Sequence, residues 1–173
     1  ITGTAADINT VYTAGSAGTI TGLGNEDITL TGAITVAQFN TVAANTTGVI
    51  TATISAGDMS SLNAITETGN ALTISVTDAS VAASSLNTLD GKTTVAIDAA
   101  TVTTLTGTTA ELNTTYTAYA AGTIIGLGNE AVTISDTTID AALLITLDAH
   151  TSGIIDASTI TTLTGSDADK ETV

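Results

Sequence analysis

Short apolar segments with a three-residue spacing recur along the chain. Ala, Ser, Glu and Gln surround them, and positions three apart lie on one face of a helix. The pattern therefore predicts short helical segments of one or two turns, with Tyr116 substituting for the weakly apolar threonines of the fifth. The six segments are Ala5/Ile8/Val11, Val36/Phe39/Val42, Met59/Leu62/Ile65, Ala83/Leu86/Leu89, Thr109/Leu112/Thr115 and Ala141/Leu144/Leu147.

The stretches between these segments are rich in Ile, Val and Thr. VITATIS, ALTISV, TVAIDAATVTTL and IIDASTITTL are examples. Branched side chains at Cβ suit a pleated surface, so these stretches predict strands. The central residues of the six helical segments lie 31, 23, 24, 26 and 32 residues apart. That period is typical of solenoids, in which one unit cannot bury its apolar face alone.

We therefore predict a β-solenoid, parallel β-helix-like, with a short helical segment in most coils. Leucine-rich-repeat-like curvature is the alternative, because helices are wider than the spacing between paired strands. Residues 1–173 would form a single solenoid fragment of a longer repeat array, with about six coils of 23–32 residues. The chain begins at Ile1 without an initiator Met and stops in mid-pattern, which also suggests a piece of a longer protein.

Two longer repeats lie above the short period. Residues 1–32 align with 105–136 at an offset of 104, and 86–107 align with 144–165 at an offset of 58. The sequence GLGNE occurs in both copies of the first repeat, at Gly22–Glu26 and Gly126–Glu130. By the same logic TGSDADKETV should begin another helical segment, but Lys170 stands at its apolar position.

Asparagine follows the central apolar residue in five of the six helical segments. One interpretation is that it ends the segment or faces water. The other is a stacked row whose amides bond to neighbouring coils. Both interpretations are structural. The residues are Asn9, Asn40, Asn63, Asn87 and Asn113.

The charge is strongly acidic, with 17 acids, two lysines and a formal net charge of −15. Nucleic-acid binding needs a basic surface, which this chain lacks. The acidic surface should instead attract cations. No cysteine is present, so disulfides and thiolate metal sites are excluded. No apolar run approaches the roughly 18 residues of a membrane span, so no membrane insertion is expected.

The GLGNE segments are the candidate metal sites. The first partly resembles the calcium-binding nonapeptide of β-rolls, although Thr21 replaces a glycine and Glu26 replaces an aspartate. Calcium prefers such oxygen ligands. The structural alternative is a glycine turn that lets a long coil return to the sheet, and we favour it. The candidate ligands are Asn25, Glu26, Asp27, Asn129 and Glu130.

Other chemistry has little support. GLGNE lacks the third glycine of a dinucleotide fingerprint, and no GK[ST] follows it. His150 is the single histidine, and the aligned position in the related repeat holds Lys92. The carboxylates Asp90 and Asp98 recur as Asp148 and Asp156, as expected of a repeated surface. We therefore expect no enzyme, no catalytic residues and no cofactor, with calcium as the minority alternative.

Rows of threonine suggest a further alternative. TIT at 19–21, TAT at 51–53 and TVT at 101–103 could present an array of hydroxyl groups, as in ice-binding β-solenoids. These triplets do not recur in every coil. An ice-binding or calcium-dependent adhesion module is therefore the alternative function.

Several sequence segments resemble those of a known protein family. LTGTTAELNT, GTIIGLGNEAVTIS and SSLNTLDGKTTVAIDAATVTTLTG are similar to the tandem repeats of giant cell-surface proteins of marine cyanobacteria, of the swimming-motility type, and to related bacterial repeat adhesins. The resemblance covers essentially the whole chain. It implies an extracellular, cell-surface location and a structural role as a rod, filament or adhesin stalk. The expected partners are neighbouring repeats or copies of the chain end to end, with a cell-surface glycan or cations in addition.

Overall fold

All six apolar segments begin a helix in the computed structural model, which describes residues 1–173. The predicted positions of the helical segments are therefore confirmed, and a seventh helix follows near the C-terminus. The helices are α1 (Ala5–Ser16), α2 (Val36–Ala43), α3 (Met59–Leu62), α4 (Ala83–Asp90), α5 (Thr109–Ala121), α6 (Ala141–Asp148) and α7 (Asp167–Lys170).

Polar side chains start most of these helices. The Thr35 hydroxyl accepts a hydrogen bond from the Gln38 backbone N–H, and the Gln38 side chain accepts one from the Thr35 backbone N–H. Thr108 and Glu111 form the same capping box at α5. Such caps satisfy backbone donors that the first turn leaves free.

Twelve short strands pair in parallel and form three sheets. The six-stranded sheet has the order β1-β2-β3-β4-β6-β8, the four-stranded sheet β11-β9-β7-β5, and the two-stranded sheet β10-β12. The strands are β1 (Thr2–Gly3), β2 (Ile28–Ile34), β3 (Ile50–Ile54), β4 (Ala71–Ser75), β5 (Ser80–Ala82), β6 (Ile97–Asp98), β7 (Thr104–Gly107), β8 (Ile124–Ile125), β9 (Ala131–Ile134), β10 (Thr138–Asp140), β11 (Ile155–Asp156) and β12 (Thr162–Thr164).

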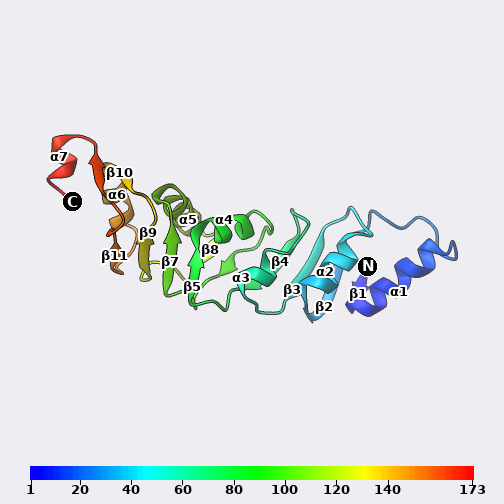
Figure 1. Ribbon diagram of the computed structural model, residues 1–173. Helices are drawn as coiled ribbons and strands as arrows, with labels where there is room; N and C mark the ends of the chain where they lie inside the picture. The colour runs from blue at the N-terminus through cyan, green and yellow to red at the C-terminus, as the bar shows by residue number, and fades with distance from the viewer.

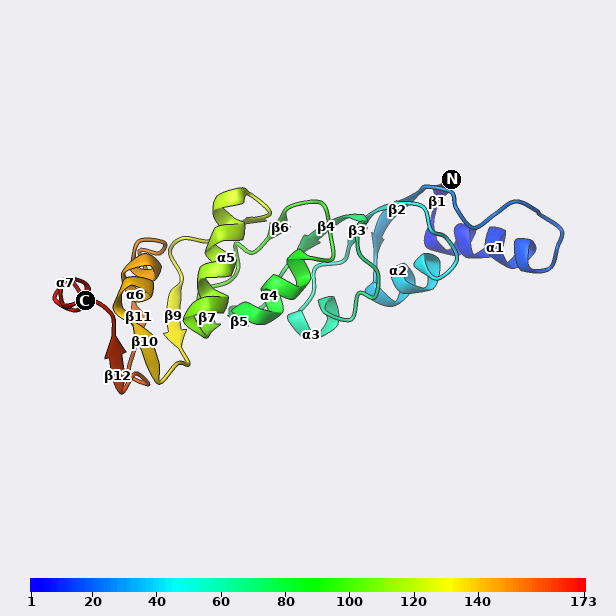
Figure 2. The same cartoon turned by 90° about the horizontal axis from the view of Figure 1, so that it is seen from above.

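The elements follow chain order from one end of the molecule to the other, with α1 and α7 at opposite ends (Figure 1). Seen from above, α2, α3 and α4 lie along one side of the six-stranded sheet (Figure 2). Exposed residues alternate with buried ones where the strands are regular, as Thr51 and Thr53 do in β3. None of the seven helices combines the length and apolar character that crossing a membrane requires.

The core is one cluster of 35 buried residues between the helices and the sheets. It contains the central residue of each predicted segment, from Ile8 (1% exposed) to Leu144 (8% exposed). No residue after Leu147 is buried, and Ile155 and Leu163 only pack against the edge of the cluster. The core therefore thins toward the C-terminal end.

The predicted β-solenoid is wrong, and so is the filament that was inferred from it. The chain is an α/β fold with three parallel sheets and seven helices, and not a solenoid of stacked coils. The physical reason lies in the helices. We expected one or two turns, but α1 and α5 run for 12 and 13 residues. Helices of that length form a layer of their own, and the strand-rich stretches divide among separate sheets.

Two of the five asparagines connect successive helical segments. The Asn40 amide donates to the Ala64 carbonyl just after α3 (2.8 Å), and the Asn87 amide donates to the Glu111 carbonyl in α5 (3.0 Å). Asn9, Asn63 and Asn113 have buried side-chain atoms with no partner. Asn40 and Asn87 therefore bond to a neighbouring segment, but the five asparagines do not form a continuous row.

Candidate functional site

The two GLGNE segments form similar glycine turns ahead of strands β2 and β9. Gly22 and Gly24 have φ values of +83° and +122°, and Gly126 and Gly128 have +87° and +112°. Residues with a Cβ rarely adopt this left-handed region, so glycine is needed at each position. The backbone turn itself is therefore repeated along with the sequence.

In the first turn, the Glu26 carboxylate bonds to the backbone of the turn itself and to helix α1. It accepts hydrogen bonds from the Gly24 N–H (2.8 and 2.9 Å) and from the Tyr12 hydroxyl (2.7 Å). These bonds hold the pKa of Glu26 below its usual value, and the bond from Gly24 has the largest effect. Burial raises the pKa of Tyr12, and its bond to Glu26 adds to the rise. Tyr12 thereby anchors the loop to α1.

In the second turn, the equivalent carboxylate is more deeply buried. Glu130 is 1% exposed, and its Oε2 accepts from the N–H groups of Gly128 (2.7 Å) and Asn129 (3.0 Å). Its Oε1 has no partner, and neither has the buried hydroxyl of Tyr116. Burial raises the pKa of Tyr116, and the neighbouring Glu130 carboxylate adds to this effect. The His150 ring stacks on Tyr116 with centroids 5.5 Å apart.

A short Thr-containing segment of the next repeat unit clamps each turn. The Thr46 hydroxyl donates to the Glu26 carbonyl (2.8 Å), and the Thr47 N–H donates to the Gly24 carbonyl (2.9 Å). The Gly48 N–H then donates to the Thr46 hydroxyl (3.0 Å). The clamp fixes both ends of the Gly24–Glu26 segment.

The second turn has the same clamp. The Thr151 hydroxyl donates to the Glu130 carbonyl (2.8 Å), and the Ser152 N–H donates to the Gly128 carbonyl (3.0 Å). The Gly153 N–H donates to the Thr151 hydroxyl (3.0 Å). Turn and clamp are thus duplicated together.

The clamps bring two backbones into very close contact. A Cβ on Gly48 would lie 2.3 Å from the carbonyl carbon and oxygen of Glu26, and one on Gly153 would lie 2.1 Å from the Glu130 oxygen. Real Cβ atoms do not approach backbone this closely, so both positions require glycine. The clamps were not predicted from the sequence. The signal was available as TTGVI (46–50) and TSGII (151–155), each about 20 residues after a GLGNE turn.

The carboxylates among the candidate calcium ligands already bond to backbone N–H groups. Both turn glutamates, Glu26 and Glu130, bond to the turn's own backbone, and Asp27 Oδ1 accepts from the Val49 N–H (2.8 Å). Asn25 and Asn129 are exposed at the tips of the turns. No group of three or more His, Asp or Glu side chains is arranged to hold a metal ion. Calcium binding at these turns stays an untested prediction.

The remaining titratable groups are dispersed. His150 lies against Tyr116 and forms no hydrogen bond with its ring nitrogens. Asp58 caps α3, where the Ser61 N–H lowers its pKa, and Asp156 has its pKa lowered by Ser158. These contacts are local turns and caps. The polar groups of the two turns and clamps therefore serve to hold backbone segments together.

Comparison with known proteins adds no relative: no protein-family model, no curated protein and no solved structure matches the chain.

Proposed function

We propose that the chain is a non-enzymatic structural repeat region of a bacterial cell-surface protein, serving as a stalk that carries or spaces other parts. The observation that supports this most is the duplicated turn and clamp. The polar groups of the GLGNE segments bond to backbone within the molecule, at Gly24 and Val49 in the first copy and at Gly128 and Asn129 in the second.

The composition supports the same proposal. Almost all charges are acidic, and the net charge of −15 favours solubility outside the cell and repels nucleic acid and anionic lipid. The resemblance to repeats of cyanobacterial surface proteins and bacterial adhesins points to the same setting. The extracellular location rests on these two arguments.

An experiment on cells tests this function. Antibodies raised against the chain should label the surface of intact cells of the source organism, and brief protease treatment of those cells should remove the label. A cytoplasmic marker should survive the protease as the control. Labelling that appears only after the cells are made permeable would overturn the proposal.

One observation favours ice binding as a second candidate. Thr2, Thr29 and Thr51 stand in register on adjacent strands β1, β2 and β3, and all three are exposed. Thr53 and Thr73 continue the face in register on β3 and β4. Adjacent parallel strands are about 4.8 Å apart, so the row is a regular array of methyl and hydroxyl groups.

Growth inhibition of single ice crystals tests this candidate. Thr29→Lys together with Thr51→Lys would break the array on its exposed face. Thr114→Lys together with Thr117→Lys places the same charges on the exposed side of α5 as a matched control. Ice binding is supported if the first pair alone abolishes inhibition. It fails if the unaltered chain does not inhibit growth, or if both pairs act alike.

A further inference from the structure

The two ends of the molecule are exposed copies of two surfaces that contact each other in its middle. Within the chain, α4 and β6 are covered by α5 and β8. At the C-terminal end, α6 and β11 repeat α4 and β6 at the offset of 58. At the N-terminal end, α1 and the residues up to Thr21 repeat α5 and β8 at the offset of 104. The internal contact therefore shows what each end fits.

The internal contact combines strand pairing with side-chain bonds. The Ile97 N–H donates to the Thr123 carbonyl and the Ala99 N–H to the Ile125 carbonyl, both at 2.9 Å. The Thr123 hydroxyl also donates to Asp90 Oδ2 (3.1 Å). Ile97, Ala99 and Ile124 are all 0% exposed.

The C-terminal end has the same surface with only the end of the chain, Thr172 and Val173, against it. Ile155 and Ala157, the equivalents of Ile97 and Ala99, are only partly buried. Strand β11 lies at the edge of its sheet and pairs only with β9, whereas β6 lies between β4 and β8. A cavity of about 310 Å³ remains here, and most of its lining is apolar. It is lined by Leu144, Ile145, Asp148, Ile155, Ala157, Thr172 and Val173.

The N-terminal end has the matching segment without its support. Ile20 is 40% exposed, although its equivalent, Ile124, is fully buried in β8. Gly22 has no atom within 4 Å of its Cβ position, whereas the same position on Gly126 lies 2.6 Å from the Ala100 backbone. The segment around Ile20 therefore corresponds to β8, which covers β6, but it packs on no strand at this end of the molecule.

The residues that would meet are matched in polarity. Inside the chain, the Thr115 hydroxyl donates to Asn87 Oδ1 at 2.7 Å. The equivalent positions at the two ends hold Val11 and Ile145, so a polar pair becomes an apolar pair. Both positions change together, which keeps the contact free of an unpaired buried polar group.

We propose that a second copy of this chain docks residues 5–21 on the α6–β11 surface, head to tail. The incoming Ile20 would cover Ile155, Val11 would pack on Ile145, and the Thr19 hydroxyl would bond to Asp148. Such a contact joins two different surfaces, so each copy keeps one of them free. The proposal rests on the proposed structural function for its biological setting. Its test measures association and not location, so the two can fail separately.

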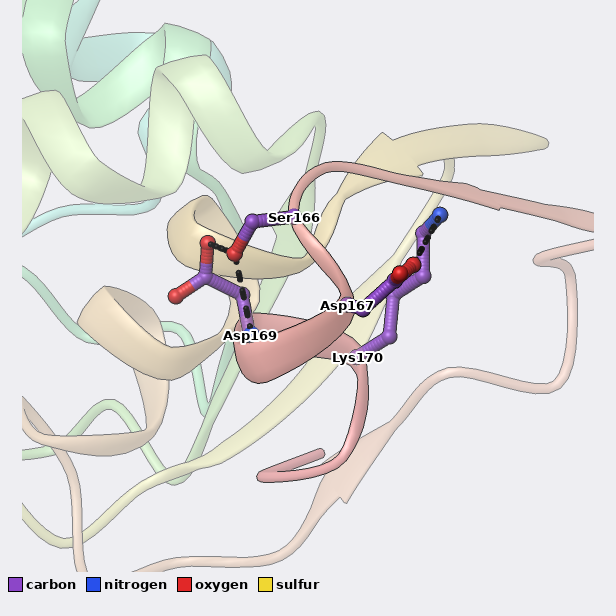
Figure 3. Close-up of polar contacts among 4 residues, drawn as sticks. All are labelled: Ser166, Asp167, Asp169 and Lys170. Atoms are coloured by element: carbon purple, nitrogen blue, oxygen red, sulfur yellow. Dashed lines mark hydrogen bonds and ion pairs between the residues drawn. The ribbon is translucent and has the colours of Figure 1, made fainter.

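Helix α7 occupies part of the docking position and is only weakly attached to the rest of the chain. Residues 164–173 repeat residues 2–11, so α7 lies where the start of the incoming α1 belongs. It buries no residue, and its polar contacts are internal, between Ser166 and Asp169 and between Lys170 and Asp167 (3.9 Å), as Figure 3 shows. Lys170 is exposed, and it stands at the position that Ile8 of the incoming copy would take. Displacing α7 therefore breaks no hydrogen bond to the rest of the chain and moves only Thr172 and Val173 out of the cavity.

Sedimentation velocity over a range of protein concentrations tests the proposal. The unaltered chain should associate, and more strongly as salt is raised, because each copy carries a charge of −15. Ile20→Asp and Ile155→Asp should each weaken association by about tenfold or more. Val95→Asp is the matched control, since Val95 is 37% exposed outside both surfaces, and it should associate like the unaltered chain.

Mixing the two variants distinguishes head-to-tail docking from any other contact. The Ile20→Asp chain keeps its α6–β11 surface and the Ile155→Asp chain keeps its N-terminal segment, so the mixture should form one-to-one dimers and nothing larger. Circular dichroism should show that each variant is folded, and Ile145→Asp replaces Ile155→Asp if the latter is not. A strictly monomeric unaltered chain, or variants that associate like it, would overturn the proposal.

Discussion

The Tyr12 hydroxyl donates a 2.7 Å hydrogen bond to the Glu26 carboxylate and thereby joins helix α1 to the glycine turn that follows it. The equivalent pair, Tyr116 and Glu130, is more deeply buried but leaves the hydroxyl and one carboxylate oxygen without partners. The same residues in the same repeat thus have different energetic roles in the two copies.

Removing the two hydroxyl groups should therefore have different consequences. Tyr12→Phe loses a bond to a charged acceptor and should lower the free energy of unfolding by about 1.5 kcal/mol. Tyr116→Phe removes a buried hydroxyl that has no partner, so it should change stability by less than about 0.5 kcal/mol or increase it. Urea unfolding of both variants measures the difference. Equal losses would mean that Tyr116 and Glu130 are bonded in solution.

The close contact at each clamp should make its glycine irreplaceable. Gly48→Ala places a Cβ 2.3 Å from the Glu26 backbone, so the turn must shift, at a cost of about 3 kcal/mol. Gly153→Ala should act alike at the second clamp.

Gly91→Ala is the control for the clamp variants. Gly91 has an ordinary φ of −69° and only van der Waals neighbours at 3.6 Å or more, so this change should stabilise by about 0.5 kcal/mol. Thermal unfolding ranks the three variants. A Gly48→Ala chain as stable as Gly91→Ala would mean that the clamp is open in solution.

Acid should weaken the fold through groups whose pKa is lowered on folding. Glu26, Asp58 and Asp156 have pKa values below their usual 4.5 and 3.8 because backbone and side-chain donors favour their charged forms. Their contribution is present in full above those usual values and is lost as the pH falls through the lower, folded-state values. Melting temperatures should therefore drop as the pH is lowered below about 4.5.

Glu26→Gln isolates one of these contributions. Protonation also relieves repulsion among the acidic groups, which acts in the opposite direction in every variant. The comparison is therefore between slopes, and the melting temperature of Glu26→Gln should depend less on pH than that of the unaltered chain. Identical slopes would show that the Glu26 carboxylate is not held by Gly24 and Tyr12.

The sequence predicted the local elements well because their signals are local. The three-residue spacing identified the first residue of each helix from Ala5 to Ala141, and all six central apolar residues are buried. The same pattern gave the wrong fold class, because it fixes where helices begin but not how far they run. The 12 residues of α1 and the 13 of α5 are set by capping and packing as much as by the apolar spacing.

The candidate site was predicted in position but not in contacts. Glycine turns at Gly22–Glu26 and Gly126–Glu130 were expected from the repeat. Their clamps join residues about 20 positions apart, as Thr46 joins Glu26, and the only signal for such a bond is the recurrence of TTGVI and TSGII after the two turns. The unpaired Tyr116 hydroxyl likewise depends on side-chain positions that the repeat does not specify.

Calorimetric titration with calcium chloride tests most directly whether the duplicated turns are structural. With their carboxylates bonded to Gly24, Gly128 and neighbouring groups, we expect no saturable heat and an unchanged melting temperature. Weak heat that disappears in salt would reflect the acidic surface alone. Saturable binding that raises the melting temperature and is lost in Asp27→Asn or Glu26→Gln would contradict the account and identify the turns as calcium sites.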